Sequence, residues 1–223
     1  MCLLTGFFFL SIVPRMPPCL PVNWVSLNFP NLVRCFLYQQ ENWELLIPLG
    51  NVPLDIWPTL FGTKVHVYPS AIATFLAPSD KSGTQGMFQE HIWAVNSWRK
   101  GQSRHDCVFV EQDSGLEGFS GLPVAWVPSF LSIKHKKVVH PCALISWCSA
   151  IRDQPCPNMK MWKVSPDLSP LGHPVLDIIH LDTILCNAHL MGVCDGSTWL
   201  PHNFRLHDSL DSFQSFYVNK YID

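Results

Sequence analysis

The sequence predicts an α+β fold that is predominantly β, with a small barrel or sandwich as its core. Short apolar runs, separated by proline, glycine and aspartate, follow one another through the second half of the chain, as is typical of β-strands. The 19 prolines and 12 glycines favour short strands and loops over long helices. Only 14% of the residues are charged whereas 48% are hydrophobic, so the chain can bury a sizeable core. The apolar runs cover residues 106–110, 121–127, 138–147, 161–164 and 176–180.

Residues 1–29 are expected to lie outside the fold, either as a disordered leader or as an artefact of the gene model. Their apolar stretch, residues 3–13, is shorter than the about 20 residues that a membrane-spanning helix needs, so no membrane segment is predicted. A secretory signal would carry basic residues before that stretch, and Met1 and Cys2 supply no such charge. Residues 30–223 are expected to form a single β-rich domain, with its barrel core at about 63–190.

The first half of that domain is expected to begin with a short helix. Apolar residues at helical spacing follow Asn31, a residue type that commonly caps helices, and predict a helix over 31–38. Residues 63–68 alternate polar and apolar side chains, which predicts a half-buried strand. Residues 71–76 fit either a second strand or a turn of helix, and residues 87–98 fit a short amphipathic segment.

Two of the apolar runs, 121–127 and 138–147, are predicted to pair as a β-hairpin. Three lysines, Lys134, Lys136 and Lys137, precede the second run and are expected at the tip. Basic side chains at such a tip commonly prevent edge-to-edge association of sheets. Binding of a partner by these lysines is the alternative.

Two further helices are predicted near the end of the chain. The buried strand predicted at 176–180 leads into residues 182–190, where Asp182 is placed to cap a short helix. Apolar residues at three- and four-residue spacing predict an amphipathic helix over about 209–221, which docks on the barrel. Its apolar stripe consists of Leu210, Phe213, Phe216, Tyr217 and Tyr221.

The charge balance excludes a global basic field as a means of binding nucleic acid. The chain has 15 lysines and arginines against 17 acidic residues, a net charge of -2, so any contact with phosphate groups must be local. The candidate is a basic cluster, Arg99, Lys100 and Arg104. Trp93 and Trp98 lie close to it in sequence and are the aromatic partners that such a contact needs. A solvated loop is the alternative interpretation.

Two sets of residues are candidates for holding zinc. The nine cysteines contain no C-x-x-C pair and are expected to be buried, reduced thiols. The thiol set has spacings that differ from those of structural zinc sites, and the histidine set has no recognised ligand spacing either, so no metal or other cofactor is predicted. The candidates are Cys142, Cys148 and Cys156 in the thiol set, and His180, Asp182 and His189 in the histidine set.

No catalytic constellation is found in the sequence. The acidic residues between 111 and 117 lie in a turn-rich segment, without the burial that separates the pKa values of a general acid and a general base. The glycines of 115–121 lack the lysine and hydroxyl residue of a phosphate-binding loop. Neither Ser120 nor Ser146 lies in a G-x-S-x-G motif. The chain is therefore predicted not to be an enzyme.

Several short motifs follow one another in order: PNLVR at 30–34, HPCALISW at 140–147, MWKV at 161–164, IHLD at 179–182, AHL at 188–190 and FYVNKY at 216–221. In this order they resemble the carboxy-terminal region of Plavaka-type transposon proteins of basidiomycete fungi. The resemblance implies a transposon-derived fragment in an intracellular, nuclear protein. It also implies that the carboxylate-based nuclease core of the transposase lies in sequence absent here, so no catalytic residue is carried over.

The order of the predicted strands is similar to that of the SH3-like barrel of bromo-adjacent homology (BAH) type, which occurs in chromatin proteins. The similarity points to Trp126, Trp147 and Trp162 as the lining of a peptide-binding face, because indole rings accept cations over their faces. Burial of these tryptophans in the core is the alternative. The expected function is a non-catalytic interaction module that binds chromatin, protein or nucleic acid. A zinc enzyme and a decayed open reading frame without activity are the alternatives.

Overall fold

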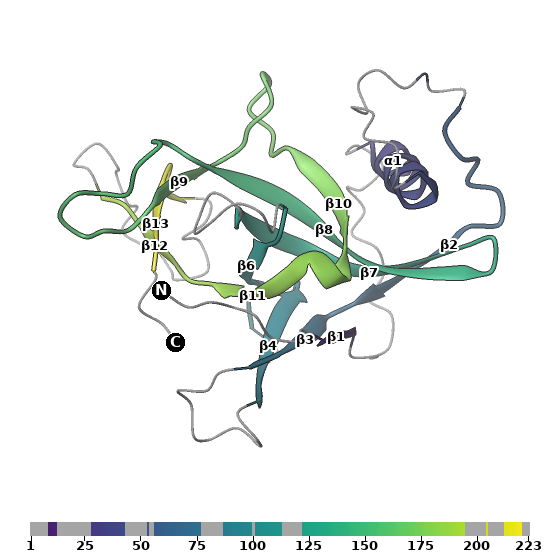
Figure 1. Ribbon diagram of the computed structural model, residues 1–223, viewed down its shortest axis with the longest axis horizontal. Coiled ribbons are helices and arrows are strands. Elements are labelled where there is room, and N and C mark those ends of the chain that lie inside the picture. Colours follow the sequence, from purple (N-terminus) through teal and green to yellow (C-terminus); the bar gives the residue numbers. More distant parts are fainter. Residues whose placement is uncertain are drawn as a thin grey trace.

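The computed structural model contains two antiparallel β-sheets and one α-helix in the residues that it describes, and the larger sheet forms a nearly closed barrel (Figure 1). The described residues are 9–12, 28–42, 53, 56–76, 87–99, 101–112, 122–194, 204 and 212–219. The elements are β1 (Phe9–Ile12), α1 (Phe29–Glu41), β2 (Lys64–Tyr68), β3 (Ser70–Leu76), β4 (Met87–Val95), β5 (Arg104–His105), β6 (Cys107–Val110), β7 (Val124–His135), β8 (Val138–Ala150), β9 (Lys163–Pro166), β10 (Leu176–His180), the 3-10 turn η4 (Leu181–Thr183), β11 (Ile184–Ala188), β12 (Leu190–Gly192) and β13 (Phe216–Val218).

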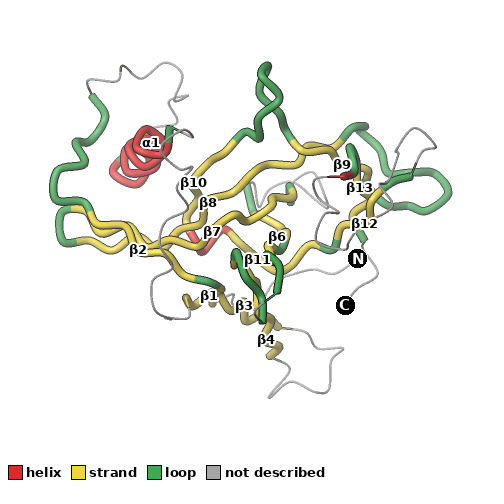
Figure 2. The backbone as a smooth tube through the Cα atoms, turned by 180° about the vertical axis from the view of Figure 1, so that it is seen from behind, coloured by secondary structure: helices red, strands yellow, loops and turns green. Residues whose placement is uncertain are grey.

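The long hairpin of β7 and β8 lies at the centre of the fold. The two strands pair along almost their whole length, and the register shifts between Trp126 and Ser129. Pro128 lies in this irregularity, where its missing N–H costs no ladder hydrogen bond. The smaller sheet packs against one face of the hairpin and α1 against the other (Figure 2). Burial of both faces explains why these strands consist of continuous apolar runs instead of alternating residues.

The smaller sheet has the strand order β1-β3-β4-β5. The small side chains of Ala71, Ala73 and Ala94 let it approach the central hairpin closely. Ile92 of β4 and Phe130 of β7 fill the remaining space and are fully buried. This packing fixes the position of β4, whose last residues lead into the turn that carries the candidate site described below.

The helix α1 covers the opposite face of the hairpin together with β10. Val33, Phe36 and Leu37 are its buried residues, as expected for an amphipathic helix on a sheet. Pro30 lies in the first turn, where its missing N–H has no intrahelical partner to lose. Arg34 donates from Nε to the carbonyl oxygen of Pro58 at 3.1 Å and so ties the helix to the segment before β2. The helix predicted at 31–38 is confirmed, with wider bounds.

The end of the barrel that lies farthest from α1, which we call the closed end, contains β9, β12 and β13 (Figure 1). The larger sheet has the order β11-β6-β7-β8-β9-β13-β12, and its two end strands are separated in sequence by His189 alone. A third apolar cluster, which includes Val124, Val164 and Phe216, fills this end. Gly192 of β12 lies so close to the ring of Phe213 that a Cβ atom would have no room. The prediction of a predominantly β fold with a barrel is confirmed.

Neither of the two helices predicted near the end of the chain has the expected bounds in the described residues. Within 209–221, Ser212 is helical, but Phe216–Val218 is the strand β13, which pairs with β9 and β12. Residues 209–211, 220 and 221 lie outside the described part. Phe216 and Val218 are buried whereas Tyr217 is half-buried, which is strand alternation. Within 182–190, only η4 is helical, and β11 follows it. Asp182 is not the N-cap of η4. The N-cap is His180, whose side chain accepts a hydrogen bond from the backbone N–H of Asp182.

β1 lies within the segment that was expected to stand apart from the fold. Phe9–Ile12 pairs antiparallel with β3, from Phe9 opposite Thr74 to Ile12 opposite Ala71. The expectation for residues 1–29 therefore does not hold for these four residues, nor for Phe29, which begins α1. Residues 71–76, which fit a strand or a helical turn, belong to the strand β3, and residues 87–95 are the strand β4.

Candidate functional site

The hairpin of β4 and β5 carries a stack of aromatic rings. His91 and Trp93 are two residues apart on β4 and therefore project from the same face, where their rings stack with centroids 5.3 Å apart and an interplanar angle of 15°. Trp98, in the turn after β4, meets the ring of Trp93 edge-on with centroids 4.1 Å apart. His91 is exposed and both tryptophans are half-buried. The three rings form one continuous aromatic surface.

Two arginines lie over the ring of Trp98. The guanidinium carbon of Arg99 is 5.3 Å from the ring centroid and that of Arg104 is 5.1 Å away, both within the range of cation–π attraction. Arg104 also pairs with Asp106, with Nε 3.0 Å from Oδ1. Arg99 forms no ion pair with any described residue.

Backbone hydrogen bonds hold the turn between β4 and β5. The N–H of Trp98 donates to the carbonyl of Gln102 at 2.7 Å, and the N–H of Gly101 donates to the carbonyl of Trp98 at 2.8 Å. Arg99 has φ 50, the left-handed conformation that lets the chain reverse here. Lys100, the third member of the predicted basic cluster, lies outside the described residues. The structure thus brings Arg99 and Arg104 together over Trp98, whose ring contacts that of Trp93.

The three tryptophans predicted to line one face lie in different surroundings. Trp126 packs in the cluster at the closed end of the barrel, and its indole N–H is buried without a hydrogen-bond partner among the described residues. Trp162 packs against the same cluster, whereas Trp147 packs against the cluster between the two sheets. The structure does not place the three on one face. Only Trp147 and Trp162 line a common pocket.

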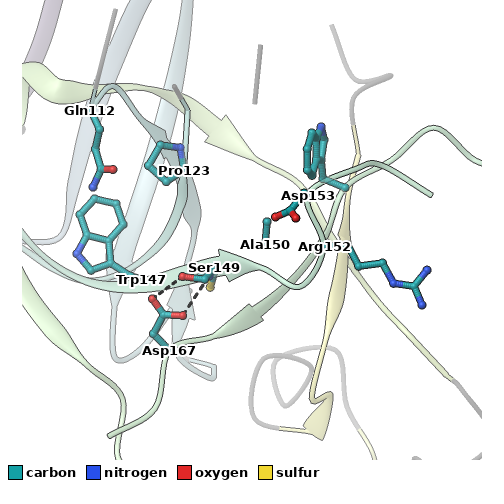
Figure 3. Close-up of a pocket in the computed structure, with 10 residues that line it drawn as sticks. Gln112, Pro123, Trp147, Ser149, Ala150, Arg152, Asp153 and Asp167 are labelled. Carbon is teal, nitrogen blue, oxygen red and sulfur yellow. Dashed lines mark hydrogen bonds between the residues drawn. The ribbon is translucent and has the colours of Figure 1, made fainter. Parts of the chain in front are cut away.

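That pocket lies at the end of β8 and has a volume of about 500 Å³ (Figure 3). Asp167 lies in its wall, where its carboxylate accepts hydrogen bonds from the backbone N–H of Ser149 at 3.2 Å and from the Ser149 hydroxyl at 2.9 Å. Arg152 directs its guanidinium away from the other labelled side chains (Figure 3). The lining residues are Gln112, Pro123, Trp147, Cys148, Ser149, Ala150, Arg152, Asp153, Trp162 and Asp167.

A second hollow of about 260 Å³ shares Gln112 and Trp147 with the first. Asp177 of β10 lies in it and accepts a hydrogen bond from the indole Nε1 of Trp147 at 3.4 Å. Burial raises the pKa of the Asp177 carboxyl, and the hydrogen bonds from the Ile178 N–H and from Trp147 offset part of that effect. Trp147 therefore stands between two hollows, with its indole N–H held by a carboxyl group.

The lysines at the tip of the central hairpin have different roles. Lys136 pairs with Glu41, the last residue of α1, with Nζ 2.7 Å from Oε1. Lys134 lies directly opposite Lys64 of β2, an arrangement of like charges that opposes strand pairing. Lys137 has φ 70, and like Lys134 and Lys136 it is exposed. The predicted hairpin with lysines at its tip is confirmed. That these lysines bind a partner stays a prediction.

The thiols proposed as zinc ligands lie in separate environments. Cys142 packs under α1, Cys148 packs in the cluster at the closed end of the barrel, and Cys156 lies in the turn that follows β8. Burial raises the pKa of Cys142 well above its usual range and that of Cys148 to about 12. The pKa of Cys156 is lowered instead, mainly by hydrogen bonds from the backbone N–H groups of Met159 and Asn158.

The histidine set is also divided. His180 Nδ1 lies 3.3 Å from the Asp182 carboxylate, but His189 follows the next strand, β11, and does not join them. Across the described residues, no three histidine, cysteine or acidic side chains converge in a way that could hold a metal ion. The two sets that the sequence proposed are therefore not assembled.

No protein-family model, curated protein or solved structure matches the chain. Among the described residues, no helix has both the length and the apolar character needed to cross a membrane. Function must therefore be argued from the arrangement of the side chains.

Sequence reasoning missed several residues of these sites. His91 lies two positions before Trp93 on β4, and this strand spacing was the signal that places both rings on one face. Arg104 and Asp106 are also two residues apart, so the same spacing could have indicated their pairing. The position of Asp153 and Asp167 in the wall of one pocket had no sequence signal, because it depends on a turn whose path the sequence does not predict.

Proposed function

We propose that this chain is a non-catalytic interaction module that binds single-stranded nucleic acid through the hairpin of β4 and β5. The observation that carries the proposal is the position of Arg99 and Arg104 over Trp98, whose ring contacts Trp93. A transposon origin, a nuclear location and an SH3-like barrel of BAH type belong to the same proposal. Their support is the order of motifs and strands in the sequence.

The two arginines have the chemistry that phosphate groups require. A guanidinium group that lies over an indole ring keeps its planar set of N–H donors at the edge of the stack, where phosphate oxygens can be bound bidentately. Stacking also restricts the side chain before the ligand arrives, so less rotamer entropy is lost on binding. Arg104 is further restricted by its ion pair with Asp106.

The aromatic rings favour a single strand over a duplex. Unpaired bases can stack on the exposed ring of His91 and on the partly exposed rings of the tryptophans, whereas the bases of a duplex are already stacked on each other. The carboxylate of Asp106 is engaged by Arg104 and by the backbone N–H of Trp93. It therefore supports the hairpin and is not poised for acid–base chemistry, which favours binding over catalysis.

Fluorescence anisotropy tests the proposal directly. The full chain is titrated into a labelled single-stranded oligonucleotide of about 12 nucleotides, within the length that similar stacking surfaces cover. We expect saturable binding that Arg99→Glu and Trp98→Leu each weaken by about tenfold or more, since one stacked base contributes about 1–3 kcal/mol. Arg99→Gln should reduce the slope of log K against log salt by about 0.7, the value for one phosphate contact with a single strand.

Arg152→Glu is the matched control, because Arg152 is an exposed arginine in the loop after β8, outside the hairpin. The proposal holds if this variant keeps the wild-type affinity while Arg99→Glu loses it. Equal losses in the two variants would mean that net charge alone drives the binding. Equal losses, or the absence of binding by the wild-type chain, would contradict the proposal and would mean that the turn between β4 and β5 is only a solvated loop.

A further inference from the structure

Two neighbouring hollows beside Trp147, which we together call the groove, lie outside the proposed nucleic-acid site. They have volumes of about 500 and 260 Å³ and share Gln112 and Trp147, so they adjoin each other. Ligand pockets commonly measure about 300–1,000 Å³. The groove is therefore large enough for more than one side chain of an extended peptide.

Carboxyl groups occur in both hollows. Asp153 and Asp167 line the first, and Glu111 and Asp177 line the second. None of the four forms an ion pair with a described lysine or arginine. Four acidic groups without a cationic partner among those residues make the groove complementary to a cation.

The arginine that lines the first hollow does not neutralise it. Figure 3 shows the guanidinium of Arg152 pointing away from Asp153 and Asp167. Its charge acts instead on the neighbouring turn, where it adds to the backbone N–H groups of Met159 and Asn158 in lowering the pKa of Cys156. The polarity of the groove is thus negative although an arginine contributes to its wall.

The indole rings complement these charges. Trp147 and Trp162 line the first hollow, and the ring of Trp147 continues into the second. Both rings are only partly exposed, and the hydrogen bond from Trp147 to Asp177 fixes the orientation of the shared ring. A cation over an indole face gains about 0.5–2 kcal/mol, more where the site is desolvated.

We infer that this groove binds a basic, extended segment of a partner protein, with lysine or arginine side chains in the two hollows. The combination of aromatic walls and carboxyl groups that form no ion pair with a described residue favours a peptide cation. The two adjoining hollows favour a chain with more than one basic residue over a single small ammonium ion. Nucleic acid is excluded from the groove by the same negative charge that attracts the peptide.

The test uses the full chain and two labelled peptides of glycine and serine, one with three lysines and one with glutamates at the same positions. Anisotropy should show binding of the lysine peptide and none of the glutamate peptide. Asp153→Lys should weaken the lysine peptide by about tenfold, a loss of about 1.4 kcal/mol. Asp182→Lys is the matched control, since its carboxylate is exposed and lines neither hollow, and it should change the affinity by less than about twofold.

Arg99→Glu separates this inference from the proposed nucleic-acid site. It should leave binding of the lysine peptide unchanged, whether or not the chain binds oligonucleotides. Equal weakening by Asp153→Lys and Asp182→Lys would overturn the inference, because attraction by net charge explains such a result. Absence of binding by the wild-type chain, or equal binding of both peptides, would overturn it as well.

Discussion

Asp106 accepts a hydrogen bond from the backbone N–H of Trp93, with 2.8 Å between the nitrogen and Oδ2. Its other carboxylate oxygen lies 3.0 Å from Nε of Arg104. One side chain thus joins β4, which carries the aromatic rings, to an arginine that lies over Trp98. The carboxylate couples the stability of the hairpin to the geometry of the candidate site.

Replacement of Asp106 tests this coupling. Asp106→Ala removes the acceptor for Trp93 and the partner of Arg104, and it should lower the free energy of unfolding by about 1.5–3 kcal/mol, as expected for hydrogen bonds to a charged group. Asp106→Asn keeps an acceptor for Trp93 and should lose less. Urea denaturation measures both, and hydrogen exchange of the Trp93 amide should accelerate in the alanine variant alone.

The raised pKa of Asp177 gives a prediction about pH. The folded chain holds the proton of this carboxyl more tightly than the unfolded chain does, so its contribution to stability is lost as the pH rises from about 4 through the folded-state pKa. Asp177→Asn cannot ionise. Its free energy of unfolding should therefore increase relative to the wild type as the pH rises from about 4 towards neutrality.

Urea denaturation at a series of pH values measures this difference. Trp147→Phe removes the indole donor that lowers the pKa of Asp177, so the pH range of the effect should move upward in that variant. A difference between Asp177→Asn and the wild type that stays constant with pH would show that the Asp177 carboxyl is not perturbed by burial.

The like charges of Lys64 and Lys134 give a prediction about stability. Lys134→Glu converts the directly opposed pair into one of opposite charge, and it should raise the free energy of unfolding by about 0.2–1 kcal/mol. Lys136→Glu is the matched control. It loses the ion pair with Glu41 and should change stability by about 0 to 1 kcal/mol in the other direction. Both effects should shrink at high salt, and equal shifts of the same sign would contradict the assigned register.

The contact between Gly192 and Phe213 gives a prediction about packing. Gly192→Ala places a methyl group against the ring, and it should lower the free energy of unfolding by about 1–3 kcal/mol. In a Phe213→Ala background the methyl group has space, so the same substitution should cost much less. A double-mutant cycle measures this coupling, and additive effects would mean that β12 does not lie against Phe213.

The sequence predicted the central elements of the fold because their burial leaves a direct pattern. The apolar run at 176–180 is the strand β10 with the same bounds, and the helix predicted at 31–38 lies within α1. β7 is longer than predicted. It continues past Pro128 to His135, and the bulge that accommodates the proline could not be inferred from the sequence.

The helix predicted over 209–221 is wrong for residues 216–218, because three- and four-residue spacing of apolar side chains does not by itself distinguish a helix from a strand with additional partners. Phe216 and Val218 satisfy strand alternation because β9 and β12 lie on either side of β13. The tertiary pairing decides the conformation there. The strand β1 had no pattern at all in the sequence.

The candidate sites differ in how far the sequence revealed them. The arginines and tryptophans of the β4–β5 hairpin are close in sequence, so their meeting could be anticipated. The acidic groove could not be predicted from the sequence, because Glu111, Asp153 and Asp177 come from segments that only the curvature of the larger sheet brings near Trp147.

The pairing of β6 with β11 has a consequence for how the chain reaches its native state. β7 and β8 are joined by a short turn, so their pairing is local in sequence. Cys107 of β6 pairs with Ala188 of β11, and the two residues are far apart in sequence. Closing the long loop between these two residues lowers the conformational entropy of the chain before the contact between β6 and β11 stabilises the fold. We therefore expect the pairing of β6 with β11 to form late, and we expect refolding on the millisecond-to-second timescale of β-rich domains.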